Sequence, residues 1–283
     1  MRNNLSSQIK LTSIPDRFIH PDNAYEQSVI TQFEKIPAFL FETIDEGSAS
    51  IAEELAAKIK EAQNENRTFA LALPGGRSPQ NVFKELIRLH KQENLSFKNV
   101  VVFLVYEFYP ITSATFSNLE QLKDAFFNHV DIDEKNIYYP DGSMDKKDIL
   151  TFCRQYEDQI EKVGGLDYIL LGIGHAGNIG FNGPGANPST RTHLSLLDSD
   201  SRKEASRTFK SLDDVPLSVI TMGLSTILKS KNIILMAWGE SKSNIIAEVI
   251  EDNMRDSMPA SFLQAHNGAR VFLDLSAGSQ LTR

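Results

Sequence analysis

The chain has 283 residues, of which 29 are Lys or Arg and 37 are Asp or Glu, so its formal net charge is −8. The apolar fraction of 41% and the charged fraction of 23% are typical of a globular protein and exclude a fibrous or disordered chain. The acidic balance argues against a general nucleic-acid binder, the single Cys153 excludes an intramolecular disulfide, and no apolar run reaches about 18 residues. We therefore expect a cytoplasmic protein with neither a nucleic-acid nor a membrane partner.

The N-terminal residues 1–45 are mixed in composition and contain Pro15, Pro21 and Pro37. A helix is predicted within them, over residues 24–33. No linker-like stretch divides the chain after this point. We interpret residues 1–45 as an arm packed on the main domain, and residues 46–283 as a single domain.

Helices and strands alternate after the arm. Ile51, Leu55 and Ile59 recur at the spacing of an amphipathic helix, and the apolar run Phe69–Leu73 follows as a buried strand. Further strands are predicted at 100–105, 167–171, 233–238 and 271–275, with helices at 117–130, 144–163 and 241–250. Short apolar strands that alternate with helices predict an open, mostly parallel α/β sheet with helices on both faces, a Rossmann-like fold.

Ligands of open α/β sheets bind at the carboxyl ends of the strands, so three segments that follow strands are candidate site loops: PGGRSP, YEFYP and the Gly-rich loop after the third strand. The first of them contains Gly75, Gly76, Arg77 and Ser78 between a strand and a helix. Glycines allow backbone N–H groups to approach an oxyanion, and the arginine and the serine add a charge and a hydroxyl donor. The alternative interpretation is a tight turn with a solvated arginine.

The loop after the third strand, GIGHAG, formally matches the dinucleotide pattern G-x-G-x-x-G. That pattern requires a helix to begin inside it, whereas the sequence continues as NIGFNGPGANP, which is too rich in Gly, Pro and Asn. No histidine is spaced from another histidine or a carboxylate as a ligand pair on one helix. We therefore predict that the protein requires neither a cofactor nor a metal.

Several segments, read in order, resemble the glucosamine-6-phosphate deaminase/isomerase family, which shares its fold with the 6-phosphogluconolactonases. They are LALPGGRSPQNVFKEL, VVVFLVYEFY, GGLDYILLGIG, FNGPG, EASRTF and WGESK. The resemblance runs from about residue 41 to residue 274. The chain resembles a longer, divergent branch of the family, in which this module is fused to a second one. The resemblance implies a sugar-phosphate ligand, a homo-oligomer, and a phosphate site made of Gly75, Gly76, Arg77, Ser78, Arg207 and Lys242.

The positions that resemble the family's catalytic half depart from its pattern. Typical members have an Asp-Glu pair where this chain has Tyr106-Glu107, and an Asp and a His where it has Ala176 and Asn178. A tyrosine is a poor base at neutral pH, and neither alanine nor asparagine titrates. The resemblance therefore implies an altered acid/base set, for which the candidate residues are Glu107, Tyr106, His175 and Asn178.

Three functional hypotheses follow. The first is an enzyme of amino-sugar metabolism, which converts a hexosamine 6-phosphate by aldose–ketose isomerisation with release of ammonia. The second is a sugar-phosphate-binding module with little turnover. The third is a hydrolase similar to the 6-phosphogluconolactonases, which also depend on the histidine that Asn178 replaces.

Overall fold

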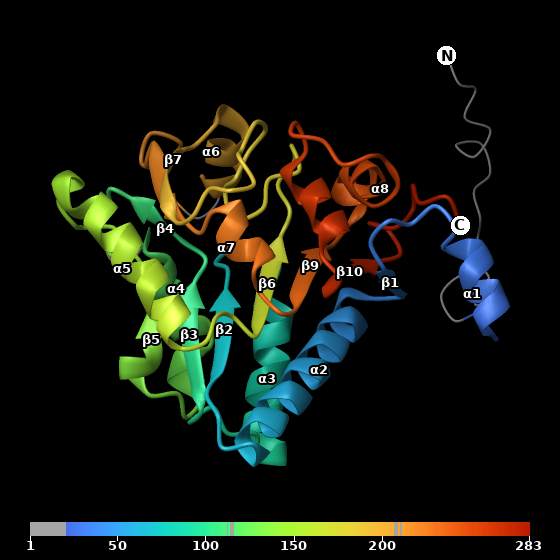
Figure 1. The fold of residues 1–283 in the computed structure, drawn as a ribbon, viewed down its shortest axis with the longest axis horizontal. Helices are drawn as coiled ribbons and strands as arrows, with labels where there is room; N and C mark the ends of the chain where they lie inside the picture. The colour runs from blue at the N-terminus through green and yellow to red at the C-terminus, as the bar shows by residue number, and fades with distance from the viewer. Residues whose placement is uncertain (1–20, 112, 114–115, 207–208, 210) are drawn as a thin grey trace.

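The computed structural model describes residues 21–283 except 112, 114–115, 207–208 and 210 (Figure 1). The main sheet of the described chain has seven parallel strands in the order β1-β10-β9-β6-β2-β3-β5. Their bounds are β1 Ala38–Phe41, β2 Phe69–Leu73, β3 Val100–Leu104, β5 Ile137–Tyr138, β6 Tyr168–Gly172, β9 Ile233–Ala237 and β10 Ala269–Asp274. The predicted open, parallel α/β sheet is confirmed.

Helices cover both faces of this sheet. Successive residues of a strand point to opposite sides, so each buried strand presents apolar side chains to both layers of helices. In β2, Leu71 packs with the apolar side chains of one layer, and Ala72 packs with those of the other. The first layer is formed by α2 (Ile44–Asn64), α3 (Gln80–Glu93) and α4 (Asn118–Ala125). The second layer is formed by α5 (Ile149–Lys162), α7 (Leu224–Leu228), α8 (Ser243–Glu251) and the 3₁₀ helix η8 (Pro259–Ala265).

A second sheet, which the sequence pattern did not predict, contains three antiparallel strands in the order β4-β8-β7. Their bounds are β4 Tyr106–Tyr109, β7 His193–Leu196 and β8 Ser218–Thr221. The segment YEFYP, predicted as a loop, is therefore mostly a strand. The remaining short helices are α1 Ala24–Ile30, α6 Ser199–Ala205, η4 Phe127–His129, η5 Glu134–Asn136, η6 Lys146–Asp148 and η7 Glu240–Lys242.

A buried carboxylate connects α5 to the second sheet. Glu157 of α5 accepts hydrogen bonds from the Thr192 backbone N–H at 2.7 Å and from the Thr226 hydroxyl at 2.6 Å, and Arg191 donates to it at 3.2 Å. Burial acts to raise the pKa of Glu157, but these donors outweigh it and hold the pKa below its usual value. The contacts fix the segment that precedes β7 against the main domain.

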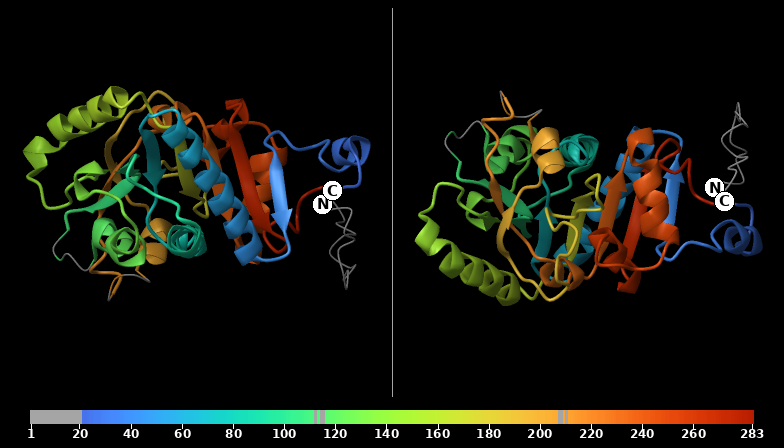
Figure 2. Two further views of the ribbon diagram at one scale, coloured as in Figure 1. Left: turned by 90° about the horizontal axis from the view of Figure 1, so that it is seen from below. Right: turned by 90° about the horizontal axis from the view of Figure 1, so that it is seen from above.

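The predicted arm contributes to the main sheet. Its strand β1 pairs with β10 at one edge, and α1 lies beyond that edge, while α5 and β5 lie at the opposite end (Figure 2). The C-terminal Arg283 donates to the Ala38 carbonyl at 2.7 Å and forms an ion pair with Glu34 at 2.6 Å. The two ends of the described chain therefore meet at the β1 edge.

The strand order changes direction at β2. The chain passes from β2 to β3 on one side, and β6 later pairs with β2 on the other side. The loops that leave β2 and β6 therefore diverge at the carboxyl edge of the sheet, where open α/β proteins bind their ligands. In Figure 1 these strands point toward the end of the molecule where α6 and α7 lie.

Candidate functional site

A cavity of about 170 Å³ opens at this edge of the sheet. It lies between the loop after β2, the strand β4, the start of α4, the loop after β6 and the helix α6. The residues that line it are Pro74, Gly75, Gly76, Arg77, Ser78, Tyr106, Phe108, Asn118, Gln121, Leu171, Gly172, Ile173, Gly174, Asn178, Gly180, Phe181, Ser201, Glu204 and Ala205. The structure thus brings together most of the predicted phosphate-binding and catalytic positions.

The glycines of the loop after β2 keep its backbone accessible from the cavity. Gly76 has a φ of +84°, which favours glycine, and a Cβ on Gly75 would lie only 2.3 Å from the Asn118 Oδ1. The indole N–H of Trp238 donates to the Ser78 carbonyl at 3.0 Å and holds the end of the loop. Glycine at these two positions leaves room for the Asn118 side chain and for the left-handed turn, so the loop backbone passes close along the cavity.

Two predicted cations, Arg77 and Lys242, approach the same point from different loops. The Nζ of Lys242 donates to the Ile173 carbonyl at 2.8 Å, and only 13% of the lysine side chain is exposed. Arg77 is 71% exposed and reaches over the rim. Both lie beside one oxygen of Glu204, at 3.8 Å for Arg77 and 3.9 Å for Lys242. An anion at this point therefore interacts with both cations.

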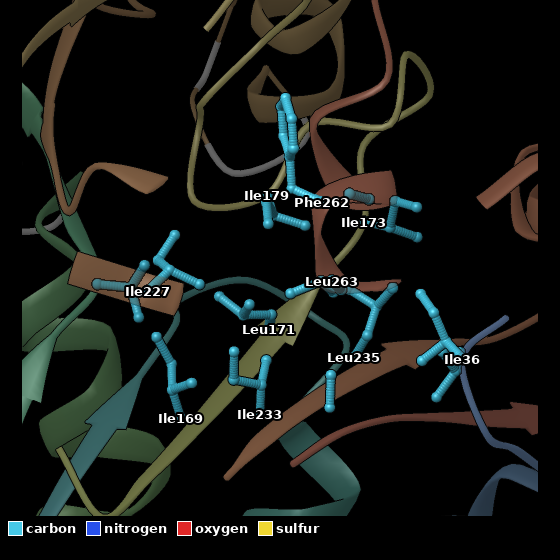
Figure 3. Close-up of a cluster of buried hydrophobic side chains, with 14 of the residues drawn as sticks. Ile36, Ile169, Leu171, Ile173, Ile179, Ile227, Ile233, Leu235, Phe262 and Leu263 are labelled. Atoms are coloured by element: carbon cyan, nitrogen blue, oxygen red, sulfur yellow. The ribbon is translucent and has the colours of Figure 1, made fainter. Parts of the chain in front are cut away.

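The loop after β6 is anchored at two isoleucines. Ile173 and Ile179 are buried in the same apolar cluster as Phe262 and Leu263 of η8, as Figure 3 shows. Between these anchors Asn178 is buried and lines the cavity, and its amide contacts the Asp198 carboxylate at 3.4 Å. His175 is half-exposed instead, with Nε2 at 3.9 Å from Glu204. The two polar side chains of this loop therefore differ in exposure, and only Asn178 lines the cavity.

Tyr106 forms one wall of the cavity. Its ring packs edge-on against Phe181 at a centroid distance of 4.5 Å, and its hydroxyl lies near the glycine loop. Desolvation raises the pKa of Tyr106 above its ordinary value, and the negative charges of Glu107 and Glu204 raise it further. At neutral pH Tyr106 is therefore a hydrogen-bond donor and not a base.

Glu107 does not line the cavity, although it is adjacent to Tyr106. Side chains alternate along a strand, so Tyr106 and Phe108 of β4 face the cavity while Glu107 faces away from it. The Glu107 carboxylate is 1% exposed and accepts hydrogen bonds at the start of α4 from the Ser117 hydroxyl and the Asn118 and Leu119 backbone N–H groups, at 2.7–3.2 Å. Burial raises the pKa of Glu107, and these bonds oppose the increase. Its contacts stabilise α4.

Replacement of Glu107 by glutamine is expected to destabilise the fold. The amide would present an N–H₂ group to donors that now contact a carboxylate, and an unsatisfied buried group costs about 1–3 kcal/mol. For a chain of this size, each 1 kcal/mol corresponds to about 2–4 °C in Tm, which thermal unfolding by circular dichroism measures. A variant with unchanged Tm that loses ammonia release from glucosamine 6-phosphate would support the catalytic role that the resemblance implies for Glu107.

Two charged residues near the cavity were missed by the sequence reasoning. Glu204 lines the cavity, and Asp198 caps α6 by accepting from the Asp200 and Ser201 backbone N–H groups. Glu204 stands three residues before Arg207 in the segment EASRTF. Arg207 lies outside the described residues. No group of three or more metal-ligating side chains occurs in the described part of the chain, and none of its helices is long and apolar enough to cross a membrane.

Comparison with solved structures shows the same architecture. A monomeric glucosamine-6-phosphate deaminase matches with a TM-score of 0.82 and 36% identity, over 87% of this chain and 100% of that one. The 6-phosphogluconolactonase of Trypanosoma brucei matches with a TM-score of 0.71 over 88% of this chain and 99% of that one. Its identity is 18%, so this second match shows the fold alone.

Sequence relatives agree with the structural match. A glucosamine-6-phosphate deaminase-like protein of Bacteroides thetaiotaomicron is 51% identical over 284 residues, which cover all of this chain and 43% of that protein. Glucosamine-6-phosphate deaminase 1 of Bacillus subtilis is 36% identical over 239 residues, 84% of this chain and 96% of that protein. The family model described as glucosamine-6-phosphate isomerases/6-phosphogluconolactonase matches residues 42–272. The chain belongs to this family.

Proposed function

We propose that the chain binds a hexosamine 6-phosphate in this cavity and converts it by aldose–ketose isomerisation with release of ammonia. The observation that carries the proposal is the convergence of Arg77 and Lys242 on a single anion position, beside a glycine loop. A phosphate dianion is well bound by backbone N–H groups together with two separated cations. The residues Gly75, Gly76, Arg77, Ser78 and Lys242 would hold the phosphate, and the resemblance adds Arg207.

The relatives support the choice of substrate. The Bacillus subtilis protein is named a glucosamine-6-phosphate deaminase, and the alignment with it covers most of both chains. The solved 6-phosphogluconolactonases match at 18–21% identity and support the fold only. A hydrolase that acts on a sugar lactone is therefore the weaker alternative.

The chemistry requires groups that move a proton between C1 and C2 of the sugar. Among the described residues that line the cavity, the ionisable side chains are Arg77, Tyr106 and Glu204, with His175 at the rim. Tyr106 and Asn178 would donate hydrogen bonds to the sugar oxygens. Of the candidate catalytic residues, His175 is the one that we propose for proton transfer, because it lies 3.9 Å from Glu204 of the cavity wall.

A sugar-phosphate-binding module with little turnover is the second candidate. It is favoured by Tyr106, whose raised pKa prevents it from acting as a base, and by Glu107, whose carboxylate is turned away from the cavity. The loss of one positioned acid or base commonly costs about 10²–10⁴ in rate. Binding without conversion is the result that this candidate predicts.

A thermal-shift panel followed by product assays separates these candidates. Glucosamine 6-phosphate, fructose 6-phosphate and 6-phosphogluconate should each raise the Tm, because ligands that bind only the native state stabilise it, whereas glucosamine should not. Ammonia release from glucosamine 6-phosphate would support the enzyme, and stabilisation without release would support the binding module. Acid release from 6-phosphogluconolactone would support the hydrolase. Absence of stabilisation by every phosphorylated sugar would refute the proposed site.

The homo-oligomer implied by the resemblance and the cytoplasmic location stay predictions. The similar solved deaminase is described as monomeric. Light scattering of the purified chain measures its mass in solution, with 31.7 kDa expected for a monomer.

A further inference from the structure

Glu204 places a negative charge among the cations of the cavity. Its carboxylate lies 3.8 Å from Arg77, 3.9 Å from Lys242 and 3.9 Å from His175. These three side chains come from the segments that follow β2, β9 and β6, which are neighbours in the sheet order β9-β6-β2. The carboxylate therefore stands where three carboxyl-edge loops present positive or protonatable groups.

The distances indicate ion pairs and not direct hydrogen bonds. Charge-assisted N–H···O contacts are about 2.7–2.9 Å long, about 1 Å shorter than those around Glu204. The carboxylate partly neutralises the cations without making close contact with any of them. A phosphate dianion has more charge and more acceptor oxygens, so it can bind the same groups more tightly.

The helix that carries Glu204 is lightly attached. None of the seven residues of α6 is buried, and 35% of the Glu204 side chain is exposed. Within the described part of the chain, the contacts of the helix include the cap Asp198, the packing of Ala205 against one apolar cluster, and hydrogen bonds from Arg202 to the Leu212 and Val215 carbonyls at 2.9 and 3.2 Å. A segment with few buried apolar contacts shifts at low free-energy cost.

We propose that Glu204 is a built-in competing anion, which occupies the phosphate position of the ligand-free cavity and is displaced by the phosphate of the ligand. The inference rests on the proposed function, because it takes the ligand to be phosphorylated. Glu204 then determines specificity: a dianionic ligand displaces the carboxylate, while a neutral sugar, which cannot pair with the cations, leaves it in place.

Isothermal titration of glucosamine 6-phosphate and of inorganic phosphate into the full chain tests this inference. E204Q keeps the shape of the side chain and removes its charge, and E204A removes both. Each variant is expected to bind both ligands about tenfold more tightly than the wild type at low salt. The matched control is D200N, which removes a carboxylate from the same helix where it pairs with Lys203 on the surface, and its Kd values should stay within about twofold of the wild type.

The outcomes separate the inference from the function on which it rests. If the wild type binds glucosamine 6-phosphate and both Glu204 variants, folded by circular dichroism, bind it equally or more weakly, then Glu204 does not compete for the site. An equal gain in D200N would also overturn the inference, because the effect would then be one of net charge. If neither the wild type nor any of the variants binds either ligand, the proposed function itself fails.

Discussion

Replacement of Lys242 by alanine is expected to weaken the binding of glucosamine 6-phosphate by about 1.5–3 kcal/mol, or roughly 10- to 150-fold. Lys242 is the better buried of the two described cations, and its ammonium group donates to the carbonyl of Ile173, a residue that lines the cavity. A hydrogen bond from a fixed, partly desolvated ammonium to a phosphate is stronger than one from an exposed side chain. Isothermal titration calorimetry measures the loss.

The control for this prediction is Lys203→Ala on α6, which removes an exposed lysine paired with Asp200. That variant should bind glucosamine 6-phosphate nearly as well as the wild type. Equal losses in the two variants would show that only net charge matters, and an unchanged affinity in Lys242→Ala would show that the phosphate binds elsewhere. The same loss is predicted for Arg207→Ala from the resemblance.

The strands of the main sheet could be predicted because burial on both faces produces continuous apolar runs. The predicted run Phe69–Leu73 coincides with β2, and the run predicted at 233–238 differs from β9 by one residue. The second sheet left no such pattern. Its strand β7 is only half-buried, and pairing between residues near 108 and 219 is a long-range contact that local periodicity does not encode.

The loop predicted to bind phosphate was easier to place at the cavity than the pair predicted to be catalytic. Gly75, Gly76, Arg77 and Ser78 are consecutive, so placing one of them at the sheet edge places all of them. Tyr106 and Glu107 are consecutive too, but they lie on a strand and therefore face opposite sides. The sequence predicts YEFYP as a loop, in which side chains do not alternate in this way, so the opposite orientations of these two residues were not predicted.

The position of Glu204 could not be inferred from its own segment. The proposed role of Glu204 depends on three basic side chains that are distant from it in sequence and approach it from separate segments. A glutamate on a short, polar helix is ordinarily a solvated residue. Its role becomes visible only in the structure, where the segments after β2, β6 and β9 bring Arg77, His175 and Lys242 close to Glu204.

The double variant Tyr106→Asp with Asn178→His is expected to raise ammonia release from glucosamine 6-phosphate by about a hundredfold or more. Both side chains line the cavity, and the substitutions supply two groups that titrate below or near neutral pH where the present residues do not. A positioned acid or base contributes about 10²–10⁴ in rate. A coupled spectrophotometric assay for ammonia measures the gain, with each single variant as a control.

The aspartate also removes a partly buried ring that packs against Phe181, which is expected to lower the stability of the variant. The assay therefore runs well below the Tm of the variant, and Tyr106→Phe shows how much of any change comes from the hydroxyl alone. If the wild type releases no ammonia and the double variant does, the binding-module candidate is supported for the natural chain. If the folded double variant binds the sugar phosphate and releases ammonia no faster than the wild type, these two positions do not limit the chemistry, because restoring titratable groups there should otherwise restore proton transfer.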